Sequence, residues 1–164
     1  MGLFDKFFKK EELPTFEDDQ VVAMCAGEFI PAEKIADPVF AKSMVGQTVA
    51  IEPSDGVITS PVNGVLEAVF PTGHAFGVRG NDGTGYLVHI GIDTVSMKGQ
   101  GFKVLKKQGD TVKAGETVVK MDLAKVNEAG HPKTTMLIVT EPLDGKEYKY
   151  IDFGTVTRNQ VISK

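Results

Sequence analysis

The sequence has only one cysteine and no long apolar segment. The first excludes a disulfide-stabilised fold, and the second argues against a membrane-spanning helix. Cys25 is the single cysteine among 164 residues, so the chain has no disulfide framework of its own. No segment approaches the ~20 apolar residues that a membrane-spanning helix needs, and no apolar signal region is recognisable. We therefore expect a reducing, cytoplasmic setting, with Cys25 packed as a small core residue.

Basic residues are too few and too dispersed for a nucleic-acid-binding surface. The formal net charge is −4, and no basic run occurs beyond the first ten residues. This balance predicts that nucleic acid is not a partner. The length fits one domain with a sizeable core, and we place that domain at residues 21–164.

Residues 1–20 are predicted to form a flexible tail, with an acidic linker at its C-terminal half. As a helix, the first ten residues would gather four apolar side chains on one face: Leu3, Phe4, Phe7 and Phe8. Lysines towards the other face would favour weak contact with an anionic membrane surface, and so a peripheral position at the inner face of the membrane. A frayed terminus is the alternative, because so short a helix is marginal in water.

Short apolar segments separated by turn residues recur from Val21 onward. The predicted strands fall within residues 21–24, 49–52, 57–65, 74–79, 86–92, 102–105, 117–121, 136–140 and 156–162. Asn63-Gly64 has the composition of a hairpin turn, and Asp122 and Gly130 have the composition of the two ends of a short helix. This spacing predicts an all-β fold, an antiparallel β-sandwich or distorted barrel of many short strands with one or two short helices.

Residues 72–95 contain two of the three histidines, His74 and His89, on either side of a glycine-rich turn. The strand around His89 alternates with period two, which turns His89 away from the core. If Asp82-Gly83 is a two-residue turn, Phe76 lies opposite His89, and His74 is a diagonal neighbour roughly 7–8 Å away at Cα. We therefore predict two imidazoles that converge on one patch and suit nucleophilic chemistry. A slip of one residue would part them, and packed structural histidines are the alternative.

Two segments of this region resemble the signatures of a known family. Residues 69–76 and 87–95 are similar to the paired histidine segments of the glucose-type enzyme IIA family, which belongs to the bacterial phosphoenolpyruvate-dependent sugar phosphotransferase system. Residues 37–41 and 98–102 continue the likeness, which covers roughly residues 25–154.

The resemblance implies that the protein relays phosphoryl groups. His89 would accept the group on Nε2 from the phosphohistidine carrier protein and pass it to a cysteine of the sugar-specific IIB domain of a permease. His74 would stabilise the phosphoryl oxygens, Thr72 would orient His74, and the Gly91 carbonyl would fix the tautomer of His89. Regulatory target proteins stay open as further partners, and the chain does not specify the sugar.

The resemblance also implies a docking surface around the histidines. Its apolar members would be Val39, Phe40, Val45, Phe70, Phe76 and Val95, and its acidic rim Asp37 and Asp93. A dry apolar surround strengthens the electrostatics of transfer and excludes water from a hydrolysable phosphohistidine. Core packing is the competing interpretation for the apolar members.

Two other classes of site are weighed against the relay. Lys120 is faintly similar to the modified lysine of biotin and lipoate carriers, but it lies within a strand pattern rather than at a turn tip. His74, His89 and Asp93 could contribute to a zinc site, yet no further ligand has a convincing spacing. We therefore predict no resident cofactor, and leave open a metal shared between the two histidines and a partner protein.

Overall fold

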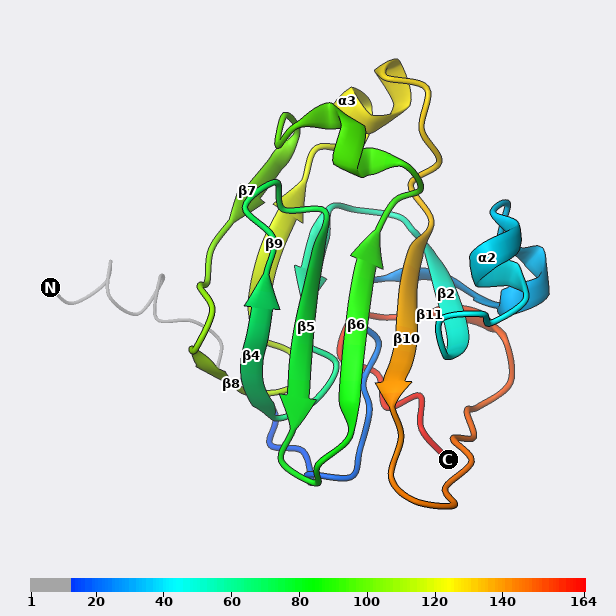
Figure 1. Ribbon diagram of the computed structural model, residues 1–164, viewed down its shortest axis with the longest axis vertical. Helices are drawn as coiled ribbons and strands as arrows, with labels where there is room; N and C mark the ends of the chain where they lie inside the picture. The colour runs from blue at the N-terminus through cyan, green and yellow to red at the C-terminus, as the bar shows by residue number, and fades with distance from the viewer. Residues whose placement is uncertain (1–12) are drawn as a thin grey trace, which may run out of the picture.

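The computed structural model describes residues 13–164, and the predicted membrane-contacting helix of the tail lies outside these residues. Its strands are β1 (Gly27–Pro31), β2 (Gln47–Pro53), β3 (Val57–Thr59), β4 (Gly64–Val69), β5 (Ala75–Gly80), β6 (Gly85–Ile90), β7 (Phe102–Val104), β8 (Thr111–Val112), β9 (Thr117–Met121), β10 (Thr135–Glu141) and β11 (Gly154–Val156). The α-helices are α2 (Pro38–Ala41) and α3 (Leu123–Glu128), and two 3-10 turns are η1 (Ala32–Lys34) and η2 (Thr94–Met97). Figure 1 shows α2 outside β2 and α3 across one end of the strands.

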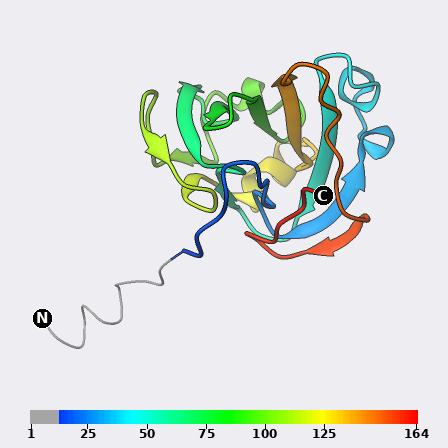
Figure 2. The ribbon, with the colours of Figure 1, turned by 90° about the horizontal axis from the view of Figure 1, so that it is seen from below.

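The strands form two antiparallel sheets. The larger has the order β11-β1-β2-β10-β6-β5-β4-β8, and the smaller has the order β3-β9-β7. Seen from below, the strands surround the interior (Figure 2). The predicted class, an antiparallel sandwich or distorted barrel with one or two short helices, is confirmed.

Apolar side chains pack on both faces of the large sheet. The main core lies on its inner face and includes Phe29, Phe76 and Leu137, each fully buried. A smaller cluster on the outer face includes Ala50, Met136 and Ile138, with Phe40 of α2 packed against it. Because side chains alternate along β6, Val88 enters the main core, whereas Leu87 and His89 face outward.

The hairpin between β5 and β6 does not have the predicted register. Gly80 N donates to Thr84 O at 2.8 Å, so the loop contains three residues, with Gly83 in the left-handed region at φ +99°. The Asp82 carboxylate supports this loop by accepting from Thr84 N at 2.9 Å. Pairing therefore shifts by one residue, and Ala75, not Phe76, lies opposite His89.

The predicted hairpin at Asn63-Gly64 is also wrong, because β3 and β4 belong to different sheets. The Asn63 side chain instead joins separate segments: its Oδ1 accepts from Ala114 N at 2.8 Å, and its Nδ2 donates to Phe16 O at 2.8 Å. The segment read as a linker thus contacts the domain at Phe16.

Other local predictions are confirmed. Asp122 caps α3 by accepting from Lys125 N, and Gly130 follows the helix with φ +81°. Cys25 is fully buried, and burial raises the pKa of its thiol. None of the helices formed by residues 13–164 has the length and hydrophobicity to cross a membrane.

Candidate functional site

His89 lies at the end of β6 on the outer face of the large sheet, and a hydrogen bond defines its tautomer. Its Nδ1 lies 2.9 Å from the carbonyl oxygen of Gly91. A carbonyl oxygen only accepts, so Nδ1 carries the proton in the neutral ring and Nε2 keeps its lone pair. Gly91 has φ +79°, and a Cβ there would lie 2.4 Å from Thr94 Cγ2, so this turn requires glycine.

His74 precedes β5 and lies beside His89. The two ring centroids are 5.4 Å apart, and the ring planes are inclined at 76°. His74 Nδ1 lies 2.6 Å from Thr72 Oγ1, and the His74 carbonyl accepts from Ile90 N at 2.7 Å. The backbones of the two histidine segments are therefore joined directly.

The rings converge by a different route from the predicted one. In the observed register, His74 pairs with Ile90, whose side chain points into the core, and strict alternation would send His74 the same way. His74, however, lies before the first residue of β5, directly after Gly73, which has φ +76°. The regular pleat does not extend to this position, and the Thr72 hydroxyl holds the ring near His89.

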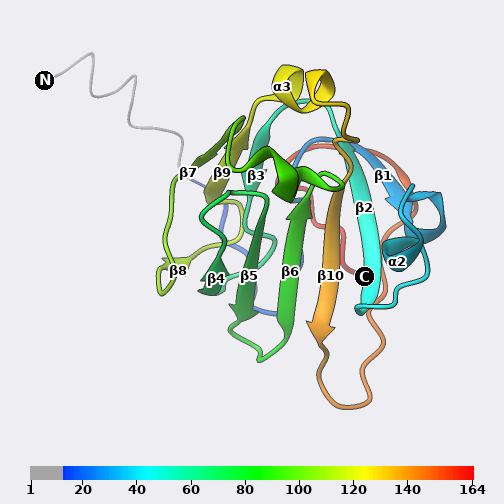
Figure 3. The ribbon, with the colours of Figure 1, turned by 45° about the horizontal axis from the view of Figure 1, so that its top comes forward.

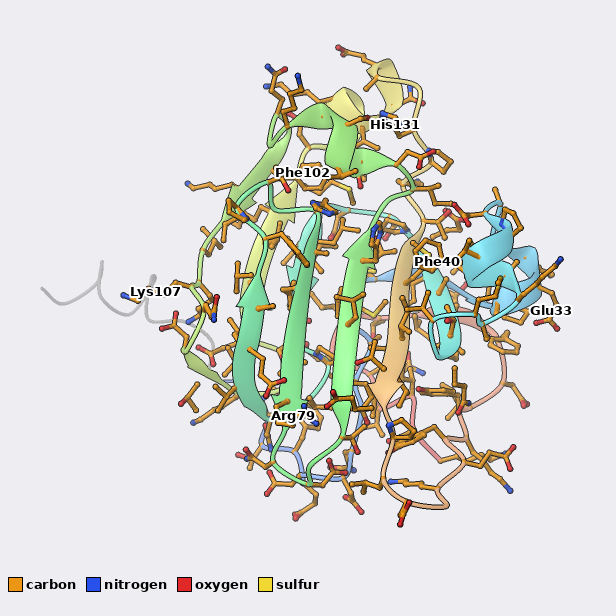
Figure 4. The ribbon with its side chains drawn as sticks, viewed as in Figure 1. Glu33, Phe40, Arg79, Phe102, Lys107 and His131 are labelled. Carbon is orange, nitrogen blue, oxygen red and sulfur yellow. The ribbon has the colours of Figure 1, made fainter. Side chains whose placement is uncertain are left out.

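Each imidazole also has a phenylalanine beside it. The Phe40 ring lies 5.2 Å from the His89 ring, and the Phe70 ring lies 5.3 Å from the His74 ring. Phe40 comes from α2, on the opposite side of β10 from β6 (Figure 4). The two histidines thus stand within an aromatic surround that removes part of their hydration.

Burial lowers the pKa of both histidines below its ordinary value. For His89, loss of hydration is the largest effect, and it is opposed by the hydrogen bond to Gly91 and the charges of Asp37 and Asp93. For His74, loss of hydration is again the largest effect, and the neighbouring His89 lowers the pKa further. Both rings are therefore neutral near pH 7, the state in which an imidazole nitrogen can attack.

Comparison with known proteins identifies the family. A family model described as phosphoenolpyruvate-dependent sugar phosphotransferase system, EIIA 1, matches residues 19–144. The chain belongs to this family.

This EIIA protein has similar relatives along nearly its whole length. It is 39% identical over 163 residues to a glucose-specific EIIA component of Oceanobacillus iheyensis, with 98% of each chain covered. It is 37% identical over 146 residues to a glucose-specific EIICBA component of Streptococcus pneumoniae, covering 89% of this chain and 20% of that protein. The solved structure of glucose permease IIA from Mycoplasma capricolum matches with a TM-score of 0.84 and 35% identity, covering 88% of this chain and 93% of that one. The protein is therefore a phosphoryl carrier of a sugar phosphotransferase system.

Large apolar side chains of this EIIA protein are exposed on the segments that border the histidines. Val39, Val45, Phe70 and Val95, all predicted for the docking surface, are 41–53% exposed, and Met44 is 69% exposed. Met44 is not among the residues predicted from the sequence for the docking surface. The adjacent apolar pair Met44-Val45, in the turn after a short helix, is a sequence feature that could have indicated its exposure. We call these residues the apolar rim: Val39, Met44, Val45, Phe70 and Val95. They come from α2 and the turn after it, the end of β4, and η2, which leaves the end of β6 (Figure 3).

Three other residues predicted for the docking surface, Phe76, Phe40 and Asp37, are less exposed than the rim residues. Phe76 is fully buried in the main core, so its assignment to the surface of the EIIA domain is wrong. The register shift places Ala75, which is also buried, opposite His89 on the outer face of the sheet. Phe40 is half-buried against His89. Asp37 is the N-cap of α2, and its carboxylate accepts from Val39 N at 2.8 Å.

Two further residues considered in the sequence analysis, Asp93 and Lys120, make none of the contacts described above with the histidine rings. Asp93 is exposed, with φ 62°, and begins the η2 turn that carries Val95. Lys120 lies within β9, as its strand pattern predicted. Among residues 13–164, no three His, Cys, Asp or Glu side chains gather in a group that could hold a metal ion.

Proposed function

We propose that this EIIA protein accepts a phosphoryl group on His89 Nε2 from a phosphohistidine carrier protein and passes it to a cysteine of a IIB domain. The observation that carries the proposal is the hydrogen bond from His89 Nδ1 to the Gly91 carbonyl, which leaves Nε2 with a free lone pair. Thr94 and the left-handed Gly91 hold the turn that supplies this carbonyl.

Acceptance is a substitution at phosphorus. The His89 Nε2 lone pair forms a bond to the phosphorus as the nitrogen–phosphorus bond of the carrier breaks, and the carrier imidazole leaves with that electron pair. The proton on Nδ1 stays in its hydrogen bond to Gly91 throughout. Phosphoryl transfer depends mainly on positioning and charge stabilisation, which a fixed ring between packed side chains provides.

Donation reverses the role of His89. A cysteine thiolate of the IIB domain attacks the phosphorus, a sulfur–phosphorus bond forms, and the electron pair of the Nε2–phosphorus bond returns to the imidazole. His74, whose ring centroid is 5.4 Å from that of His89, is placed to donate a hydrogen bond to the transferring oxygens. Thr72 orients His74 by bonding its Nδ1, so that Nε2 faces the reaction.

We propose that the carrier protein and the IIB domain both dock on the apolar rim. Val39, Val45, Phe70, Val95 and the exposed part of Phe40 would contact the partners directly. Phe40 would also contact His89 and exclude water from its phosphorylated form. Asp37 and Asp93 would supply negative charge to the same face. Phe76, being buried, has no part in this contact.

The named relatives support further proposals about the sugar and the partner. Several are glucose-specific components, so we propose glucose as the sugar of the system that this protein serves. In the S. pneumoniae EIICBA component the matched segment is part of a longer chain, which supports a permease partner for this domain. We place the relay in the cytoplasm, where a phosphohistidine carrier protein would meet it.

The test is phosphorylation by the purified general components. Incubation with phosphoenolpyruvate, enzyme I and the carrier protein should add one acid-labile phosphate to the wild-type protein. His89→Ala should remain unlabelled, whereas His131→Ala, a matched loss of the third histidine, should label normally. Phosphate on another residue, or unchanged labelling of His89→Ala, would contradict the proposal.

A further inference from the structure

A network of four hydrogen bonds holds the turn that follows His89. Three of them run between backbone groups: Ile90 N donates to His74 O at 2.7 Å, Gly91 N to Thr134 O at 2.9 Å, and Ile92 N to Pro132 O at 3.1 Å. In the fourth, Thr94 Oγ1 donates to the Ile90 carbonyl at 2.5 Å. Thr94 therefore contributes the one side chain of these four bonds.

The Thr94 bond acts on a specific peptide plane. The peptide between Ile90 and Gly91 has its carbonyl held by Thr94 and its N–H held by Thr134. Two bonds to opposite sides of one plane prevent its rotation. The next plane carries the Gly91 carbonyl, which accepts the proton of His89 Nδ1. The direction of that carbonyl thus depends on two planes: its own, held by the bond from Ile92 N to Pro132 O, and the preceding one, which Thr94 fixes.

Thr94 also packs directly beneath Gly91. It is fully buried, and its Cγ2 would lie 2.4 Å from a Cβ added at Gly91. Glycine lacks the Cβ that restricts rotation, so the Gly91 backbone has many alternative conformations once a neighbouring bond is lost. A buried carbonyl left without its donor would drive such a change, since an unsatisfied polar group is costly away from water.

We propose that Thr94 is a positioning residue for phosphoryl transfer, acting through the Ile90–Gly91 peptide to keep the proton of His89 on Nδ1. The inference rests on the proposed function, because it matters for the reaction only if Nε2 is the attacking atom. Without the Thr94 hydroxyl, the Ile90–Gly91 plane keeps only its bond to Thr134, and the Gly91 carbonyl holds the Nδ1 proton less firmly. A fraction of the rings then carries the proton on Nε2 and cannot attack.

The test compares Thr94→Val with Thr94→Ser. Valine keeps the branched shape and the methyl group beneath Gly91 but lacks the hydroxyl, whereas serine keeps the hydroxyl. Thr59→Val is the matched control, because Thr59 is also buried and donates to a backbone carbonyl, that of Met24, from β3 in the other sheet. Should Thr94→Val fail to fold, Thr94→Ala removes the same hydroxyl without filling the site.

Two readouts separate positioning from general destabilisation. Imidazole ¹⁵N chemical shifts of the unphosphorylated protein report the tautomer of His89, and initial rates of phosphorylation by the carrier give kcat and KM. We expect Thr94→Val to give a mixture of tautomers and to lower kcat in proportion to the fraction of rings that lose the Nδ1–H tautomer, about 2- to 10-fold. KM for the carrier should stay unchanged, since buried Thr94 cannot touch a partner. Thr94→Ser and Thr59→Val should match the wild type in both measurements.

The tautomer measurement and the kinetic measurement also distinguish a failure of this inference from a failure of the proposed function. If Thr94→Val keeps the Nδ1–H tautomer and the wild-type kcat, or if Thr94→Ser is impaired to the same extent, the inference is overturned. If the wild-type protein accepts no phosphate on His89, the proposed function fails, while the tautomer measurement still decides whether Thr94 controls this ring.

Discussion

Phe76 and Phe40 differ in burial, and replacing each by alanine should have opposite consequences. Phe76 is fully buried on the inner face of β5, among side chains of both sheets. Phe40 is half-buried, and its ring packs against His89. We predict that Phe76→Ala lowers stability with little effect on carrier binding, and that Phe40→Ala impairs phosphoryl transfer with a small effect on stability.

The magnitudes follow from burial. Removing a fully buried phenylalanine costs about 3–5 kcal/mol, which for a domain of this size lowers Tm by roughly 6–20 °C. Removing the partly exposed Phe40 ring should cost less than this, about 1–2 kcal/mol, because complete burial of a large apolar side chain contributes about 1.5–3 kcal/mol. An interface anchor is commonly worth about 2 kcal/mol, so Phe40→Ala should raise KM for the carrier about 30-fold.

Thermal melting followed by circular dichroism and steady-state phosphorylation below each Tm measure the two effects independently. Measured where it remains folded, Phe76→Ala should accept phosphate with a wild-type KM. The reasoning is refuted if Phe76→Ala melts with the wild type, or if Phe40→Ala keeps both its stability and its KM.

Three further predictions concern charge and protonation. His74 and His89 have folded pKa values below the ordinary value of about 6.5, so the unfolded chain binds more protons, and the free energy of unfolding should fall as pH decreases below about 6.5. Urea unfolding between pH 5 and 7.5 should show this slope, and a His74→Gln/His89→Gln double variant that kept it would contradict this assignment. Asp37→Ala should lower the free energy of unfolding by about 1 kcal/mol, because α2 loses its N-cap, whereas Asp37→Asn should keep the wild-type stability. If thermal melting shows an equal loss of stability in both variants, the charge of Asp37, not its capping hydrogen bond, stabilises α2. His74→Gln should slow donation to the IIB cysteine more than acceptance from the carrier in rapid-quench measurements, and wild-type rates in both steps would make His74 purely structural.

The sequence predicts the fold class because short strands and their turns are local features. Period-two alternation around His89 gives its outward direction, and the Asp122 cap and Gly130 give the limits of α3. Strand pairing is harder to predict. Asn63-Gly64 has hairpin composition, but the chain crosses between sheets there, because β3 pairs with the distant β9 whereas β4 pairs with β5 and β8. Local composition carries no information about such partners.

The site shows the same division between local and long-range information. The Gly91 hydrogen bond joins residues two positions apart and follows from the family resemblance. The burial of Phe76 depends instead on one residue of register, which follows from the three-residue loop; within that loop the Asp82 carboxylate accepts from Thr84 N. The Thr94 bond was not predicted, because a threonine in a short loop gives no sign that its hydroxyl faces a particular carbonyl.

The engagement of Nδ1 with Gly91 has a kinetic consequence for the proposed relay. With one ring nitrogen occupied, the phosphoryl group must arrive at and depart from the same atom, on the same face of the protein. The donor and the recipient therefore compete for one position and cannot be bound productively together. Each turnover is then a ping-pong cycle, in which the first protein must dissociate before the second can bind, and an excess of either unloaded partner would inhibit the flow of phosphate to sugar.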